Sequence, residues 1–299
     1  MVPHQQGVEA SLLERFMSQD RPSLDAFGGR LSERVRAFFS RERVFRDASR
    51  TCDFERLAAE LERLGAPWFD KVFELEEDFG GLVRRGSHPR NPSLALGLFQ
   101  LICIGLGSSA DEDADDDSAI VSSSWPMGRL ASTSESLVHV GLYTPEGDLY
   151  MSEAGWMFWY IPMLDRVELL SGSASTFLER IALEDHVRHE MREYAATFFT
   201  ADAGPAVAEA LGLPSVEEAS DAVVSHWMGP SLFVSRLPPT AASDVRRTRL
   251  ISRAVKDLLP AARLVAERAP DASATVETHL PGGRERFDAL RREGILVSE

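Results

Sequence analysis

Hydrophobic residues recur at helical spacing in two neighbouring segments near residue 60. The first segment begins at a cap formed by Thr51 or Asp53 and ends at Gly65, and its apolar positions are Phe54, Leu57, Ala58, Leu61 and Leu64. The second begins at Pro67 and ends at Gly80-Gly81, and its apolar positions are Trp68, Val72, Leu75 and Phe79. Apolar residues three and four apart, between a start signal and a glycine, predict two amphipathic helices.

The pattern then changes to short apolar runs separated by turn residues. Four such runs occupy Leu137–Tyr143, Leu149–Met151, Trp156–Ile161 and Arg166–Leu170. Proline and glycine stand between the first two runs and Gly155 precedes the third, as β-turns prefer. We therefore predict four consecutive strands. The apolar residues on both faces of the aromatic third run indicate a strand covered on both sides.

After this strand-rich part the spacing is mostly helical. Ser171–Ser175 forms a small-residue linker, and Thr176 with Glu179 has the spacing of a capping box, so we predict a helix from here to about Phe199. The remainder also reads as mainly helical. It has a short helix at Pro205, a second capping-box pair, and a long helical pattern that Pro260 should kink, with one strand candidate at Ser231–Leu237.

Together these patterns predict an α+β protein with a mostly antiparallel central sheet flanked by helices, and a helical C-terminal extension. We expect three regions: a helical N-terminal extension over 1–50, an α+β domain over 51–185, and a mainly helical region over 186–299 that packs on it.

Negative charge is concentrated in the middle of the chain. The net charge is −15, and residues 51–185 hold nine basic against 24 acidic side chains, whereas the flanking regions are close to neutral. Such a field repels nucleic acid and anionic lipid and favours a basic partner. An acidic surface that serves only solubility is the alternative.

Nothing in the sequence indicates export or membrane insertion. The N-terminus lacks a basic region followed by an apolar core, and the longest mostly apolar run, Leu94–Leu106, is too short to span a bilayer. Cys52 and Cys103 have no metal-binding or disulfide spacing, which suits a reducing compartment. We expect a cytoplasmic protein with no membrane partner.

A dense acidic block interrupts the central region. The block repels itself and buries no core, so we expect a solvated loop with an electrostatic role toward a basic partner. It lacks the glycine of a calcium-binding EF-hand loop. Its acidic residues are Asp111, Glu112, Asp113, Asp115, Asp116 and Asp117.

Several short motifs resemble the SUKH superfamily, the yeast cell-wall-regulator-like fold. In that family a helix ends in an acidic-aromatic stretch followed by Gly-Gly-Leu, as in Val72–Leu82 here. Downstream, Gly147-Asp148 resembles the family's turn and Trp156–Ile161 its aromatic strand, and Ser175–Glu179 resembles the start of its last helix. The resemblance covers roughly residues 51–185. The long acidic insertion and the C-terminal third depart from the minimal fold.

The resemblance implies a binding protein that is not an enzyme. Bacterial members of this superfamily typically act as immunity proteins that sequester a cognate toxin, and such toxins are frequently basic. An adaptor or regulator with the same fold is the alternative. The acidic residues that we expect to contact the partner are Glu76, Glu77, Asp78, the block Asp111–Asp117, Glu146 and Asp148.

The most enzyme-like group lies on the helix that follows the strands. His186 and His189, with Asp185 and Glu193 nearby, could hold a metal ion, but their order fits none of the usual zinc-hydrolase motifs. The same residues make an ordinary solvated helix face. A metal-dependent enzyme is therefore the third hypothesis, and we expect no catalytic residue, metal or cofactor. His139 and His226 read as packing residues.

Overall fold

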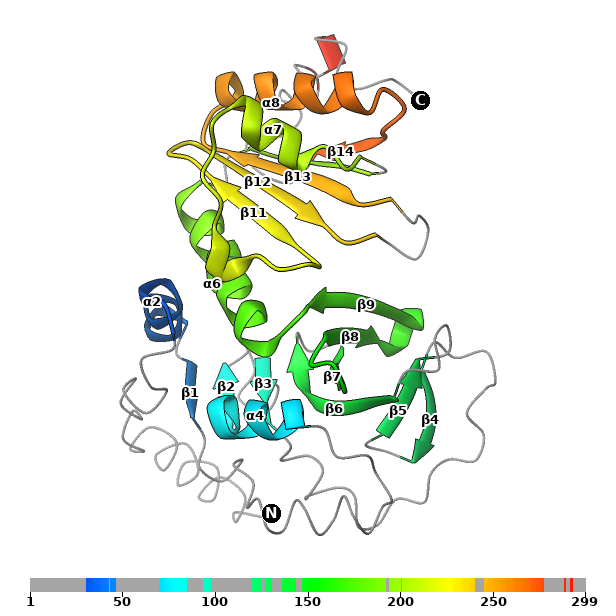
Figure 1. Cartoon of the computed structure of the whole chain (residues 1–299). Helices are drawn as coiled ribbons and strands as arrows, with labels where there is room; N and C mark the ends of the chain where they lie inside the picture. Colours follow the sequence, from blue (N-terminus) through cyan, green and yellow to red (C-terminus); the bar gives the residue numbers. More distant parts are fainter. Residues whose placement is uncertain are drawn as a thin grey trace, which may run out of the picture.

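The computed structural model contains two antiparallel sheets joined by one long helix (Figure 1). It describes residues 31–42, 44–46, 70–84, 94–97, 120–124, 127–130, 136–143, 147–191, 194–199, 201–239, 245–276, 288 and 291–292. The predicted α+β class with antiparallel sheet is confirmed. The predicted helix over 51–64 and the acidic block lie outside the described residues.

The first sheet has nine strands, in the order β1-β2-β3-β6-β7-β8-β9, with β5 also pairing with β6 and β4 with β5. The four strands predicted from alternating runs and turns are β6 to β9, each within two residues of its predicted bounds. The strands are β1 (Val44–Arg46), β2 (Leu82–Arg84), β3 (Leu94–Leu96), β4 (Ile120–Ser124), β5 (Met127–Leu130), β6 (Ser136–Tyr143), β7 (Asp148–Ser152), β8 (Met157–Ile161) and β9 (Arg166–Ser171).

Strand β6 pairs with three other strands of this sheet. Its first half pairs with β5, its second half with β3, and its other edge with β7. The ladder with β7 shifts register between His139 and Gly141. Gly141 has φ +148°, and a Cβ there would lie 1.9 Å from the carbonyl oxygen of Ala95. Only glycine lets β3 approach this irregular point of β6.

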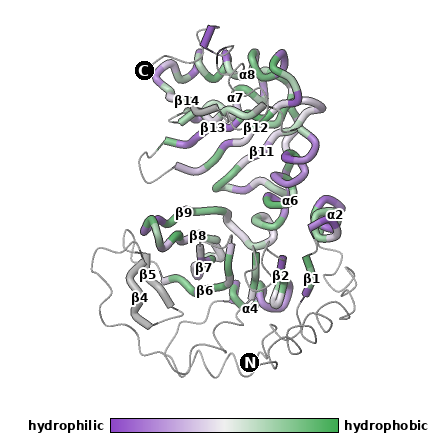
Figure 2. The backbone as a smooth tube through the Cα atoms, turned by 180° about the vertical axis from the view of Figure 1, so that it is seen from behind, coloured by the Kyte–Doolittle hydropathy of each residue, from purple (hydrophilic) through white to green (hydrophobic). Residues whose placement is uncertain are grey.

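Helix α4 (Asp70–Phe79) packs on the first sheet through the predicted stripe of Val72, Leu75 and Phe79, and it ends at Gly80 as expected. Strands β6 and β9 are mostly hydrophobic in Figure 2, whereas hydrophobic and hydrophilic residues alternate along α2 (Glu33–Arg41) and α8 (Val255–Arg268). That alternation is what a helix with one buried face requires.

The C-terminal region contains a second sheet, so the expectation of a mainly helical region is wrong. Its order is β11-β12-β13-β10-β14, all antiparallel. The predicted strand at β12, the helix opened by Pro205 and the second part of the long helical pattern are confirmed. The elements are β10 (Tyr194–Phe198), α7 (Gly204–Ala210), the 3-10 helix η4 (Glu217–Ala219), β11 (Ser225–Met228), β12 (Leu232–Leu237), β13 (Arg247–Ser252), α8 and β14 (Ala274–Val276).

Alternating side chains of the second sheet reach two separate cores. Val234 and Leu250 face α7 and α8, whereas Phe233 and Ile251 face the other side. A sheet covered on both faces has apolar residues at successive positions, and this removes the alternation by which single strands are recognised. The long helical pattern predicted over 244–269 is therefore β13 followed by α8, which continues through Pro260.

Helix α6 (Ala174–Glu190) belongs to both halves of the molecule (Figure 1). Its first turns bury Phe177 and Leu178 in the core of the first sheet, and its last turns bury Leu183 and Val187 against the second. The helix starts earlier than predicted, because Ser173 rather than Thr176 is the N-cap: the Ser173 hydroxyl accepts the Thr176 N–H at 3.1 Å. It ends at Glu190, not near Phe199, since β10 pairs with β13 and β14.

Helix α2 lies beside α6 and belongs to the same core as the first sheet. It buries Val35, Phe38 and Phe39, and the following β1 pairs with β2. Its N-cap Ser32 donates from its backbone N–H and its hydroxyl to the buried carboxylate of Glu179, at 3.0 and 2.6 Å. Residues 31–42 and 44–46, which fall within the predicted N-terminal extension, thus pack on the first sheet and share its core.

Asp221 provides a polar link between the halves. One carboxylate oxygen accepts from the Ser171 hydroxyl and the Gly172 N–H, both at 2.7 Å, where the first sheet ends. The other accepts from the N–H groups of Val223 and Val224, at 2.7 and 2.9 Å, in the loop before β11. One carboxylate therefore fixes the segment between η4 and β11 onto the start of α6.

We expect Asp221→Ala to lower the free energy of unfolding by about 3 kcal/mol, because it leaves four donors without their charged acceptor. Urea unfolding followed by circular dichroism measures this change. Asp202→Ala is the matched control, since Asp202 pairs with Arg236 on the exposed surface of the second half. The control should cost about 1 kcal/mol or less, and an equal loss in the two variants would contradict the role of Asp221.

His226 is fully buried in β11. Its ring stacks on Phe233 with ring centres 5.5 Å apart, and Nδ1 lies 3.1 Å from the Ser235 hydroxyl oxygen. Burial lowers the pKa of His226 to about 3, because the imidazolium cannot be hydrated there, and nearby arginines act in the same direction. These contacts are consistent with the predicted packing role of His226.

This burial makes stability depend on pH. Between the folded pKa of about 3 and the ordinary value of about 6.5, the unfolded chain binds a proton that the folded chain does not. Stability should therefore fall as pH drops below about 6.5, by about 2 kcal/mol at pH 5 from this residue. We expect His226→Gln to remove that part of the loss when unfolding is compared at pH 7.5 and pH 5. An unchanged pH dependence in the variant would show that another group is responsible.

Candidate functional site

A pocket of about 320 Å³ opens between α4, the β7–β8 turn and the start of α6. The apolar stripe of α4 anchors this helix in the core, and the flank beside it forms one wall of the pocket, with Leu75 and Phe79 of the stripe included. The last linker residues before α6 and the first residues of α6 form the facing wall. The lining residues are Lys71, Glu74, Leu75, Asp78, Phe79, Met151, Ala154, Gly155 and Gly172 to Ser175.

Acidic side chains follow the exposed side of α4. Asp70, Glu74 and Glu77 are exposed at helical spacing, and Asp78 is partly buried at the pocket wall. Lys71 donates to both carboxylate oxygens of Glu74, at 2.9 and 2.6 Å. Both members of this pair are about half exposed, so solvent weakens the interaction and a competing cation can replace Lys71 at little cost.

Gly155 adds a close backbone approach to the pocket, and an exposed aromatic residue follows it in the chain. Gly155 has φ +86°, and a Cβ there would lie 3.2 Å from Cγ of Lys71. The next residue, Trp156, is 42% exposed, an unusual exposure for so large an apolar side chain. We name the set Asp70, Glu74, Glu77, Asp78, the pocket and Trp156 the α4 surface.

The predicted contact residues divide into four groups, and the fourth consists of Glu76 alone. Glu77 and Asp78 lie on the α4 surface. Asp148 is partly buried in β7, and its carboxylate lies 3.2 Å from Nε2 of the buried His139, so it has a partner within the fold. The block Asp111–Asp117 and Glu146 lie outside the described residues.

Glu76 does not fit the prediction, because it is only 2% exposed. Its carboxylate folds against the end of α4, where a Cβ on Gly80 would come within 2.4 Å of Oε1. Glu76 stands four residues after Val72 and three before Phe79, so the spacing that predicted the apolar stripe also places it on that stripe. A buried carboxylate of this kind shapes the turn before β2 and is not a surface contact.

The sequence prediction missed Glu74, Lys71 and the residues before α6. Glu74 and Glu77 are three apart on the side opposite the apolar stripe, and this spacing was the available signal. No comparable signal indicated that the Ser-rich linker would face α4, because that contact depends on how β7 and β9 are placed.

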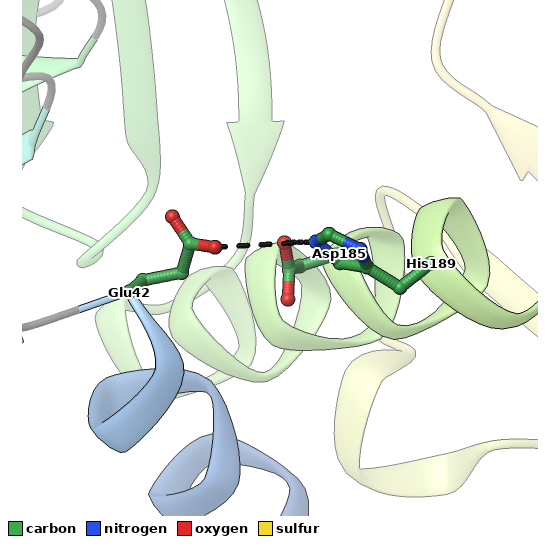
Figure 3. Close-up of side chains that lie close together, drawn as sticks. All are labelled: Glu42, Asp185 and His189. Carbon is green, nitrogen blue, oxygen red and sulfur yellow. Dashed lines mark ion pairs between the residues drawn. The ribbon is translucent and has the colours of Figure 1, made fainter.

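The structure brings a different group to His189 than the one predicted. Glu42, Asp185 and His189 point toward one another from the end of α2 and from α6 (Figure 3). His186 is partly buried and is not in this group, and burial lowers its pKa. Of the residues named in the third hypothesis, Asp185 and His189 therefore meet, His186 lies outside the cluster, and Glu193 lies outside the described residues.

Arginines gather where the two halves meet, and they bond to backbone carbonyls. Arg180 donates to the carbonyl of Leu170, Arg246 donates to those of Ala222 and Val223, and Arg253 donates to that of Glu190. These contacts hold neighbouring segments together. They place positive charge at the junction and leave the α4 surface acidic.

None of the helices in the described part of the chain has both the length and the apolar content that a membrane crossing requires. Comparisons with models of protein families, with curated proteins and with solved structures found no match to this chain.

Proposed function

We propose that this protein binds a basic protein partner through the α4 surface, as an immunity-type protein that sequesters a toxin. The observation that carries the proposal is the row of exposed carboxylates on α4, beside a pocket lined by Glu74 and Asp78 and next to the exposed Trp156. Protein interfaces often combine an aromatic anchor with complementary charge at the rim.

The pocket and its charge fit a lysine or arginine side chain of the partner. An entering cation would replace Lys71 at Glu74, and this exchange costs little because the existing pair is exposed. The excess of acidic residues over 51–185 would draw a basic protein toward this surface and raise the rate of encounter. The SUKH-like motifs support the immunity role, because bacterial members of that family typically neutralise toxins.

An adaptor or regulatory protein of the same fold is the second candidate, and it would use the same surface. The immunity protein and the adaptor differ in whether the bound partner is a toxin. Co-purification from the native host followed by mass spectrometry identifies the partner. Under the immunity proposal, co-expression of this protein protects cells from that partner's toxicity. A captured partner that is acidic, or is a nucleic acid, would contradict both candidates.

We expect Glu74→Lys with Glu77→Lys to slow association with the captured partner by about tenfold or more at low salt. The difference from the wild-type protein should shrink as salt screens the charges. Surface plasmon resonance at several ionic strengths measures both effects. Glu217→Lys with Glu218→Lys is the matched control, because both residues are exposed on η4 and the change in net charge is the same. Equal slowing in the two double variants would reject the α4 surface as the contact.

We expect the Trp156 side chain to affect mainly the rate at which the captured partner dissociates. Trp156→Ala removes an apolar anchor, and we expect a loss of about 2 kcal/mol in binding, or about 30-fold in Kd. Leu211→Ala is the control, because Leu211 is an exposed apolar residue in the second half of the molecule. An unchanged dissociation rate for Trp156→Ala would place the ring outside the interface.

A further inference from the structure

The end of α2 and the last turns of α6 meet in a cluster with a metal-ligand composition. Glu42 is the C-cap of α2, and Asp185 and His189 are four residues apart on α6. Their ligand atoms all lie within 4.8 Å of one another. The buried side chains of Val35, Phe38 and Phe39 hold α2 against the core that α6 shares, so the fold itself brings these groups together.

The distances are close to those of a coordinated ion. Nε2 of His189 lies 3.4 Å from Oδ1 of Asp185 and 4.0 Å from Oε1 of Glu42. Ligand bonds of about 2.0 to 2.2 Å to Zn²⁺ place the ligand atoms of a tetrahedral site about 3.4 Å apart. The Asp185–His189 separation matches that value, whereas the Glu42–His189 separation of 4.0 Å is longer, so Glu42 must move closer to bind the same ion.

Two arginines orient the carboxylates from outside the cluster. Arg41 donates to Oδ2 of Asp185, and Arg84 donates to Oε2 of Glu42. Each carboxylate is thus held by the oxygen that points away from the cluster, and its other oxygen is the one near His189 (Figure 3). Hydrogen bonds to the outer atoms of ligands are the usual support of metal sites in proteins.

We propose that Glu42, Asp185 and His189 bind a divalent transition-metal ion of the Zn²⁺ class, which would link α2 to α6. One imidazole nitrogen with two carboxylate oxygens suits Zn²⁺, whereas Ca²⁺ and Mg²⁺ prefer all-oxygen sites. His189 is half exposed, so water has access to complete the coordination on that side. The guanidinium groups of Arg41 and Arg84 offset the carboxylate charge, so the affinity should be micromolar rather than nanomolar.

This site lies on α2 and α6, and none of its residues belongs to the α4 surface. It therefore does not depend on the proposed partner. A metal between the two helices would stabilise the folded chain in proportion to its occupancy, because the unfolded chain does not hold these groups together.

The test is a titration of the chelator-treated full chain with ZnCl₂ by isothermal calorimetry, together with thermal unfolding with and without the ion. We expect saturable binding of one ion per chain and a higher Tm with Zn²⁺. His189→Gln should weaken binding at least tenfold and remove the rise in Tm. His186→Gln is the matched control, since it lies one turn earlier on the same helix outside the cluster, and it should bind as the wild-type chain does.

Glu42→Gln provides a second variant that does not remove the buried partner of Arg41. It should also weaken Zn²⁺ binding at least tenfold while its circular dichroism spectrum stays that of the wild-type chain. With Co²⁺ in place of Zn²⁺, the visible absorption of the wild-type complex should disappear in both cluster variants. Absence of saturable binding, or equal loss in His186→Gln and His189→Gln, would overturn the proposal.

Discussion

Helix α6 is packed into two hydrophobic cores at once, and the arrangement of the molecule depends on this. Phe177 and Leu178 are fully buried against the first sheet, and Leu183 and Val187 are fully buried on the second. Full burial of an apolar side chain of this size contributes about 1.5 to 3 kcal/mol. The two halves therefore share one helix, and displacing it from either sheet would expose several such side chains.

Two buried or partly buried carboxylates form hydrogen bonds that hold neighbouring segments against α6. Asp221 holds the loop before β11 to the start of α6, and the carboxylate of Glu179 holds the N-cap of α2. The two candidate sites lie near the two ends of α6 as a result. The pocket of the α4 surface includes the residues before its first turn, and the Glu42–Asp185–His189 cluster includes its last two turns.

Local sequence chemistry was sufficient where consecutive elements pack as neighbours. Strands β6 to β9 follow one another with short turns, so apolar runs separated by proline and glycine predicted all four. The apolar stripe of α4 and the glycine at its end were also predicted, because both are signals within one short segment of the chain. The other strands of the second sheet were missed because both faces of that sheet are covered, and its strands then lack the alternation that would distinguish them from buried helix.

The sequence by itself determined the charge distribution, the α+β class, the strand-rich centre and the apolar face of α4, because these follow from composition and from the spacing of residues close together in the chain. Only the tertiary structure decided that Glu76 is buried, that Glu42 meets His189, and that the linker before α6 faces α4. Each of these depends on which distant segments become neighbours. Residue spacing describes a single helix or strand, whereas the packing of α6 against two sheets sets the distances between elements.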